Sequence, residues 1–227
     1  MESLDMLANN IANTDTGGYK TDREFYSLFT SAEASSESPA GLPVIEKNYT
    51  DYSQGAMRPT ASPLDFGIQG KGFFAVDSPS GVAYTRNGSF HLNQAGTLVT
   101  ADNYAVRSAA GNSITLDPKL PVEVAADGTI TQSGQGADKL GVLDFTNQAD
   151  LVKQGNTLFH AADPNTVPVI SSAEVQQGKL ENSNVGNSES VVRLVSVMRQ
   201  FDMLQKAVHI GQSMNLKAID EVAKISA

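Results

Sequence analysis

The longest regular pattern in the chain is helical and covers residues 188–225. Asn187 or Ser188 can cap its start, and Glu189 lies in the first turn, where its charge complements the helix dipole. One apolar stripe has near-heptad spacing, and a second follows a neighbouring face. The first comprises Val191, Leu194, Met198, Phe201 and Val208; the second comprises Met203, Ala207, Ile210, Met214, Ala218, Val222 and Ile225. So little polar surface remains that this helix requires packing partners.

The chain offers this helix too little surface to pack against. A helix of about 38 residues is about 57 Å long at 1.5 Å per residue. The other helical pattern, with Leu4, Leu7 and Ile11 at spacings of three and four, covers about a third of that length. Gly211 inside the long helix costs about 1 kcal/mol relative to Ala, which packing must offset. We therefore predict self-association through the chain ends.

The segments after the first helix differ in character. Asn13 to Gly18 is a polar, glycine-containing block that ends the helical pattern. A second, weaker amphipathic segment follows around Phe25, Tyr26, Leu28 and Phe29. The stretch SAEASSESPAG, Ser31 to Gly41, has the small, polar composition of a linker. We expect little order in that stretch.

From about Leu64 to Leu180 the pattern changes to short runs rich in β-branched and aromatic residues, separated by turn signals. The runs include Gly72–Val76, Val82–Thr85, Ser89–Leu92 and Thr97–Thr100. The Asn87-Gly88 pair between two of these runs is the strongest short hairpin signal, because both residues tolerate positive φ. The zone predicts an all-β module of antiparallel hairpins.

Composition excludes several classes of function. The chain carries 25 acidic and 16 basic residues, a formal charge of −9, and no basic block, which argues against a nucleic-acid partner. No window approaches 18 consecutive apolar residues, so we expect no membrane insertion. The first residues lack the pattern of a secretory signal, so we expect export without a cleaved signal peptide if the protein leaves the cytoplasm. With no cysteine, the chain has no disulfide and no thiolate metal site.

No residue pattern points to an enzyme, a cofactor site or a metal site. His91, His160 and His209 lie far apart in sequence, without a partner at ligand spacing. The loop Gly67 to Gly72 matches neither the Walker spacing nor the dinucleotide fingerprint, so we interpret it as a β-turn or bulge. Phe73 and Phe74 fit a β core. Met198, Met203 and Met214 fit helix packing rather than a methionine metal site.

Four aspartates leave an enzymatic alternative open. Asp65, Asp77, Asp102 and Asp127 could supply the carboxylate pair of a carbohydrate-active enzyme. Asp102 and Asp127, however, lie in Asn- or Gly-flanked turns, where Asp is favoured for its local hydrogen bonds. Another alternative is a β-rich surface binding or adhesion module with a coiled-coil oligomerisation tail, for which exposed aromatic residues should cluster.

Three stretches resemble one protein family. LANNIANTDTGGYK, Leu7 to Lys20, resembles the N-terminal signature of the bacterial flagellar axial proteins. The stretch from Pro63 to Val106, PLDFGIQGKGFFAVDSPSGVAYTRNGSFHLNQAGTLVTADNYAV, is similar to the start of the β domain in the rod and hook branch. Gly178 to Val208, GKLENSNVGNSESVVRLVSVMRQFDMLQKAV, is similar to that branch's C-terminal motif. The total length and Arg199 to Met203 resemble a rod subunit, closer to the proximal than to the distal one.

The resemblance implies a mainly β fold with terminal helices that pair as a coiled-coil-like inner domain. The expected boundaries are 1–30 for the inner helix and exit turn, 31–62 for the linker, 63–181 for the outer β domain and 182–227 for the C-terminal helix. It implies a structural subunit of the basal-body rod, exported by the flagellar type III apparatus. Outside the cytoplasm, the subunit would polymerise helically with its own copies and other rod and hook subunits, in a rod that spans the periplasm and transmits motor torque to the hook.

Within this resemblance, the expected assembly residues lie at both ends of the chain. Asn9, Asn10 and Asn13 would satisfy backbone groups and neighbouring subunits, and Gly17 and Gly18 would allow a sharp exit towards the β domain. Alternatively, Asn13 to Gly18 is merely a helix C-cap. The further candidates are Leu4, Leu7, Ile11, Val191, Leu194, Met198, Phe201, Met203, Val208, Ile210 and Met214.

Two departures from the family pattern stand out. Only six residues precede the N-terminal signature, so we expect an incomplete mate for the C-terminal helix. Ser183 to Gly186 reads Ser-Asn-Val-Gly where Ser-Asn-Val-Asn is usual.

Overall fold

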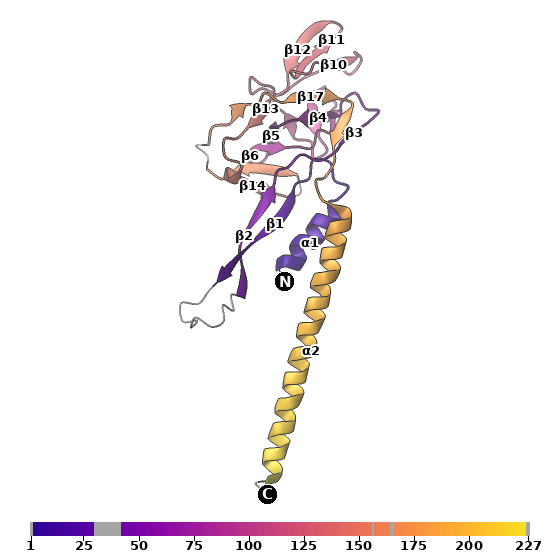
Figure 1. The fold of residues 1–227 in the computed structure, drawn as a ribbon. Helices are drawn as coiled ribbons and strands as arrows, with labels where there is room; N and C mark the ends of the chain where they lie inside the picture. The colour runs from indigo at the N-terminus through magenta and orange to yellow at the C-terminus, as the bar shows by residue number, and fades with distance from the viewer. Residues whose placement is uncertain (1, 30–41, 156, 164–165, 226–227) are drawn as a thin grey trace. The chain divides into compact units, whose positions relative to one another are not determined.

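The computed structural model describes residues 2–29, 42–155, 157–163 and 166–225. The chain divides into two compact units: Met1–Ile11 together with Gly186–Ala227, and Ala12–Val185. The first unit contains the helices and the second contains the strands (Figure 1). This confirms the predicted class, mainly antiparallel β with terminal helices.

Two α-helices make up the described part of the first unit. They are α1 (Glu2–Ala12) and α2 (Asn187–Ile225), of 11 and 39 residues. Both helical patterns in the sequence are therefore confirmed, including the position of Glu189 in the first turn of α2. The described helices contain no stretch that is long and apolar enough to cross a membrane.

The second unit is built from short strands joined by turns. In chain order, they are β1 (Thr21–Phe29), β2 (Leu42–Asp51), β3 (Met57–Pro59), β4 (Phe66–Gln69), β5 (Phe73–Ser78), β6 (Gly81–Thr85), β7 (Phe90–Leu92), β8 (Leu98–Thr100), β9 (Ala105–Val106), β10 (Val122–Val124), β11 (Thr129–Gln132), β12 (Gln135–Lys139), β13 (Val142–Asp144), β14 (Leu151–Gln154), β15 (Leu158–Ala161), β16 (Val169–Ile170), β17 (Glu174–Gln177) and β18 (Lys179–Glu181). The 3-10 helix η1 (Gln148–Asp150) precedes β14.

The largest sheet follows the order β14-β15-β6-β5-β9-β8-β7, and β13 joins it by pairing with both β5 and β16. A three-stranded sheet, β10-β11-β12, and three two-stranded pairs, β1-β2, β17-β4 and β18-β3, complete the unit. Every registered pair is antiparallel. The two pairs formed with β17 and β18 bring residues 174–181 next to residues 57–69.

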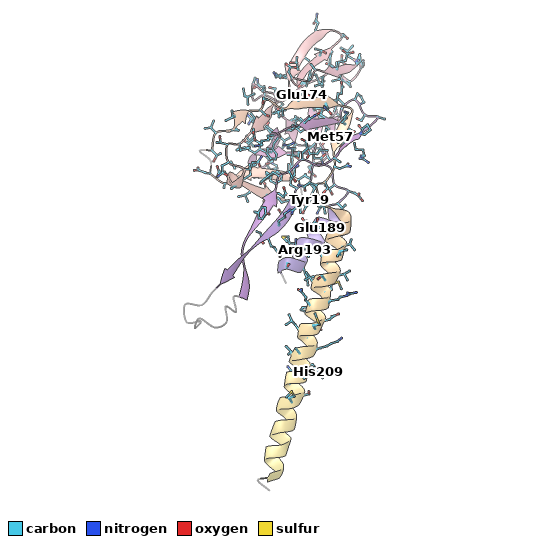
Figure 2. The ribbon with its side chains drawn as sticks, viewed as in Figure 1. Tyr19, Met57, Glu174, Glu189, Arg193 and His209 are labelled. Carbon is cyan, nitrogen blue, oxygen red and sulfur yellow. The ribbon has the colours of Figure 1, made fainter. Side chains whose placement is uncertain are left out.

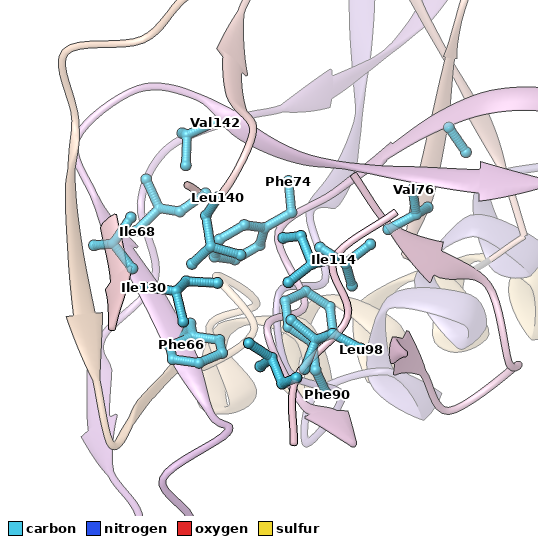
Figure 3. Packing of buried hydrophobic residues seen from close by; sticks show 14 residues of the cluster. Phe66, Ile68, Phe74, Val76, Phe90, Leu98, Ile114, Ile130, Leu140 and Val142 are labelled. Atoms are coloured by element: carbon cyan, nitrogen blue, oxygen red, sulfur yellow. The ribbon is translucent and has the colours of Figure 1, made fainter. Parts of the chain in front are cut away.

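Strand β5 separates two apolar clusters. Successive side chains in a strand point to opposite faces. Phe74 and Val76 therefore join one cluster, whose labelled members surround Phe74 in Figure 3, and Phe73 and Ala75 join the other. All four side chains are buried. This confirms that the Phe73-Phe74 pair belongs to the core.

The hairpin predicted at Asn87-Gly88 was wrong. Strand β6 pairs with β5 and β15, and β7 pairs with β8, so the two runs that flank Asn87 are not partners. Instead, the Phe66 N–H donates to the Gly88 carbonyl at 3.0 Å. A Cβ on Gly88 would lie 1.7 Å from the Phe66 carbonyl oxygen. Gly88 is needed for this close approach of two chain segments rather than for a tight turn.

Two other expectations meet different outcomes. The second amphipathic segment, around Phe25, is strand β1, paired along its length with β2 and with a register shift at Phe25/Tyr26. The expected linker from Ser31 to Gly41 lies outside the described residues. The turn or bulge expected between Gly67 and Gly72 is confirmed, since Gly70 and Gly72 have φ of 110° and 140° between β4 and β5.

Candidate functional site

Three charged side chains meet inside the second unit. Lys20 lies just before β1, Arg86 directly follows β6, and Glu181 ends β18. The Lys20 Nζ is 2.6 Å from one Glu181 carboxylate oxygen, and the Arg86 Nη1 is 3.1 Å from the other. Their side chains are 0%, 3% and 0% exposed, respectively. We call these three residues the charge cluster.

Backbone groups complete the coordination of the charge cluster. Lys20 Nζ donates to the Ser53 carbonyl at 2.7 Å, and the Gly55 N–H donates to Glu181 Oε1 at 2.8 Å. Arg86 Nη2 donates to the Gly70 carbonyl at 2.7 Å, and its guanidinium carbon lies 5.2 Å from the centre of the Phe73 ring. The cluster therefore gathers five separate segments of the chain around one carboxylate.

The electrostatics make the cluster dependent on all its members. Burial lowers the pKa of Lys20 and the pKa of Arg86, and in each case the Glu181 carboxylate opposes the shift. The desolvation penalty of a buried ion is several kcal/mol, and it is offset only by close partners and saturated hydrogen bonding. Removing Glu181 would leave two buried cations with no close counter-ion. The cluster is therefore a joint that forms only when distant parts of the chain come together.

Two glycines allow the backbone to approach the charge cluster. Gly18 has φ of 69°, and its N–H donates to the Glu181 carbonyl at 2.7 Å. A Cβ on Gly18 would lie 2.3 Å from the Asn87 amide nitrogen. A Cβ on Gly55 would lie 2.0 Å from the Asn182 carbonyl oxygen. Only residues without a side chain fit at these positions, and Gly18 additionally requires the left-handed conformation.

Asn184 forms a second connection beside the cluster. Its Oδ1 accepts hydrogen bonds from the Thr21 N–H at 2.7 Å and the Thr21 hydroxyl at 2.8 Å. Its Nδ2 donates to the Asp51 carbonyl at 2.7 Å and to the Ser53 carbonyl and hydroxyl, both at 3.1 Å. One amide thus connects the residues before α2 to the start of β1 and the end of β2.

The predicted assembly residues occupy different environments. In α1 and the following block, Leu7, Asn10, Asn13 and Gly18 are buried, Leu4, Ile11 and Gly17 are half-buried, and Asn9 is exposed. On α2, Leu194 is half-buried, whereas Val191, Met198, Phe201, Met203, Val208, Ile210 and Met214 are exposed. Asn13 Oδ1 accepts from the Thr16 hydroxyl at 3.2 Å, as expected of a local cap. Gly18 contacts the charge cluster through its hydrogen bond to the Glu181 carbonyl.

Sequence reasoning did not single out Lys20, Arg86, Glu181 or Asn184. Each lies inside one of the three quoted motifs: Lys20 in the first, Arg86 in the second, and Glu181 and Asn184 in the third. Charged residues beside glycines and apolar runs were the available signal, since a charge in such a setting is either exposed or paired. The sequence does not say which charges pair.

The enzymatic candidates lie on different elements of the chain. His91 lies on β7 and His160 on β15. His209 lies along α2 (Figure 2). The described residues include no group of three His, Cys, Asp or Glu that could hold a metal ion. Asp77 pairs with Arg107 at 3.5 Å, and Asp127 accepts bonds from the Thr129 N–H and hydroxyl, as expected of a turn aspartate.

The adhesion alternative predicted a cluster of exposed aromatic residues. Among the described side chains, the exposed large hydrophobic residues include two aromatics, Tyr49 and Phe201. They lie in different units of the chain. The described surface therefore gives no support to an aromatic binding platform.

Family models match three parts of the chain. A model described as the flagella basal body rod protein matches residues 2–20. The D1 domain of the flagellar hook protein FlgE/F/G matches residues 67–132, and the C-terminal part of the flagellar basal body rod FlgEFG protein matches residues 176–221. Each matched region contributes one residue of the charge cluster.

Individual proteins are similar over most of their length. The flagellar basal-body rod protein FlgF of Mesorhizobium japonicum is 34% identical over 202 residues, which cover 88% of this chain and 83% of the relative. FlgF of Caulobacter vibrioides is 30% identical over 98% of this chain and 93% of the relative. The flagellar basal-body rod protein FlgG of Bacillus subtilis is 29% identical over 90% and 88%, respectively.

Proposed function

Since the chain belongs to the family of flagellar basal-body rod proteins, we propose that it is a structural subunit of the rod in the flagellar basal body. Its partners are other rod and hook axial subunits and further copies of itself. The subunits polymerise helically through their terminal helices, and the polymer transmits motor torque to the hook. The relatives named FlgF and FlgG, together with the three matched family models, support this role.

The observation that carries the proposal is the apolar surface of α2. Among the side chains of this helix that the structure describes, ten large hydrophobic ones are exposed, which are Val191, Val192, Val195, Met198, Phe201, Met203, Leu204, Val208, Ile210 and Met214. Exposed apolar patches of this kind mark interaction sites in soluble proteins. A Cβ on Gly211 would meet no atom of the described residues within 4 Å, so packing among those residues does not explain the glycine. Close approach of a helix from another subunit does.

The charge cluster has a defined task in this proposal. A rod subunit under load must keep both ends of its chain attached to its outer domain. The residues that follow α1 and those that precede α2 are both held at the cluster, by Lys20 and Glu181 and by the Thr21–Asn184 bonds. We expect Gly18, with φ of 69°, to provide the turn that the chain needs after α1. The charge cluster thus attaches both ends of the chain to the strands of the subunit.

Our proposals for export and final location are based on the same family membership. We propose that the flagellar type III apparatus exports the chain and that the rod it joins spans the periplasm. A joint that forms only when distant segments meet suits this route, because an exported chain must refold after passage. The expected division into 1–30, 31–62, 63–181 and 182–227 stays a proposal for how assembly and outer functions are distributed.

A pair of substitutions on α2 tests the assembly role. Met198→Glu places a charge among the exposed apolar residues, and Gln200→Glu places the same charge at an exposed polar position of the same helix. We expect Met198→Glu to abolish polymers, because burying an unpaired charge at a subunit contact is costly, whereas Gln200→Glu retains them. Sedimentation and electron microscopy measure assembly, and circular dichroism verifies the β fold. Normal polymers from Met198→Glu would contradict assembly through α2.

A further inference from the structure

Lys153 makes three close contacts with the segment that leads into β1. Its Nζ donates to the Lys20 carbonyl at 2.8 Å and to Asp22 Oδ2 at 2.8 Å. The same ammonium lies 3.9 Å from the centre of the Tyr19 ring. Its side chain is 15% exposed. One cation on β14 therefore contacts the Tyr19 ring, the Lys20 carbonyl and the Asp22 carboxylate.

The chemistry of these contacts suits a fixed position. An ammonium has three donors and no acceptor, and an aromatic face attracts the cation by its quadrupole. Burial lowers the pKa of Lys153, and the hydrogen bond to Asp22 opposes that shift. A carboxylate, a carbonyl and an aromatic ring all face this ammonium. A side chain with neither a charge nor a hydrogen-bond donor, such as that of methionine, would form none of these three interactions.

A cavity borders the base of the β1–β2 hairpin beside Lys153. This cavity of about 840 Å³ is lined by residues 48–52 at the end of β2, by residues 144–149, by Lys71, and by Leu151, Val152 and Lys153. The end of β2 and the strand β14 therefore both border this open space. Space is available for the base to tilt towards the sheet.

Other described attachments lie at the base of the hairpin. Thr21 and the Asp51 carbonyl are bonded to the Asn184 amide, and the Tyr52 ring lies 5.8 Å from that of Phe73 and 5.4 Å from that of Phe159. These contacts anchor the base at Asn184 and at the aromatic rings. Lys153 supplies a third point of attachment, beside the cavity.

We infer that Lys153 is the positioning residue that fixes the direction in which the β1–β2 hairpin leaves the sheet. Contacts of Thr21 and Tyr52 hold the base of the hairpin in place, and Lys153 fixes the angle between the hairpin and the sheet. This role is separate from assembly through α2, and it concerns residues that lie entirely in the second unit.

Pulsed electron paramagnetic resonance tests the inference in the full chain. The sequence contains no cysteine, so nitroxide labels at Asn48→Cys and His91→Cys are unique. Asn48 is exposed on β2, and His91 is exposed on β7 at the far edge of the large sheet. In the labelled Lys153→Met variant, we expect the distance distribution to broaden and its maximum to shift. Lys139→Met is the matched control, because Lys139 is in an exposed ion pair with Asp127, and its distribution should not change.

Circular dichroism measures folding separately from hairpin direction. If Lys153→Met keeps its fold and shows the unmodified distance distribution, Lys153 does not set the angle. If Lys153→Met fails to fold, Asp22→Asn replaces it, since that change removes the charged partner and leaves the bond to the Lys20 carbonyl in place. A broadened distribution in Asp22→Asn supports the inference, and an unaltered one overturns it. Both results are independent of whether the protein polymerises.

Discussion

The Lys20 ammonium and the Glu181 carboxylate lie 2.6 Å apart, both fully buried, although 161 positions separate them in the sequence. Arg86 adds a second cation to the same carboxylate at 3.1 Å. Each residue comes from a different family-matched region. Their meeting defines where the two ends of the chain join the strands, and it governs the first prediction.

Glu181→Gln removes the negative charge that pairs with both Lys20 and Arg86 in the charge cluster. We expect a loss of about 3–5 kcal/mol in the free energy of unfolding, because breaking a buried ion pair on one side leaves uncompensated buried charge. Urea denaturation followed by circular dichroism measures the loss. Lys139→Met is the control, since its ion pair is exposed, and its midpoint should stay nearly unchanged. Equal midpoints for the two variants would show that the cluster does not hold the joint.

Gly18→Ala should destabilise the β unit strongly. The left-handed conformation alone costs about 1–2 kcal/mol for a residue with a Cβ, and the new atom would press on the Asn87 amide. Gly134→Ala separates these effects, because Gly134 has φ of 78° but nothing within 4 Å of its Cβ position. We expect Gly18→Ala to lower the urea midpoint clearly more than Gly134→Ala. The same loss in both would mean that conformation alone, and not the close approach, is responsible.

Asn184→Asp keeps the shape of the side chain and removes its donors. The Asp51 and Ser53 carbonyls would lose the hydrogen bonds from Asn184 Nδ2 and face a carboxylate instead, although the Ser53 carbonyl keeps its bond from Lys20 Nζ. We expect a loss of about 1–3 kcal/mol, the usual cost of leaving polar groups unsatisfied. Asn112→Asp is the control, because its side chain is exposed. The unfolding temperatures of both variants test this prediction. If Asn184→Asp unfolds at the same temperature as Asn112→Asp, the Asn184 amide does not contribute to holding β1 and β2 to the residues before α2.

Ionisation of Tyr52 should lower the stability of the folded chain at high pH. Burial raises the pKa of Tyr52 to about 12 from its ordinary value of 10.0. Between these values the unfolded chain loses the phenolic proton first, so the stabilising contribution of Tyr52 is complete below pH 10 and disappears as the pH rises towards 12. Tyr52→Phe keeps the ring contacts and removes this titration.

The measurement for Tyr52 is the free energy of unfolding at pH 9 and pH 11 for the original chain and Tyr52→Phe. We expect the original chain to lose more stability than the variant over this interval. Tyr19 and the buried lysines titrate equally in both proteins and cancel in the difference. Identical losses would show that the Tyr52 hydroxyl remains in contact with water. Tyrosinate absorbance follows the ionisation directly.

Local patterns in the sequence predicted most of the elements. Apolar spacing placed α1 and α2, and turn residues with β-rich runs placed β5 to β8 close to their observed bounds. The secondary structure around Phe25 could not be predicted from the sequence, because the apolar spacing there fits both a strand and a helix. Pairing with β2 makes the segment a strand. The Asn87-Gly88 signal failed because the neighbouring Phe66 backbone, and not local turn geometry, determines the conformation of Gly88.

The sequence alone determined the types of the elements, the need of the long helix for partners, and the three motifs that indicate the family. These depend on periodicity and composition within short windows. Only the tertiary structure decided which strands pair, which charges are buried together, and which glycines serve a close approach. Lys20, Arg86 and Glu181 are ordinary charged residues until folding removes water from all three at once. Burial of charge is a property of the whole packed unit, and no local pattern encodes it.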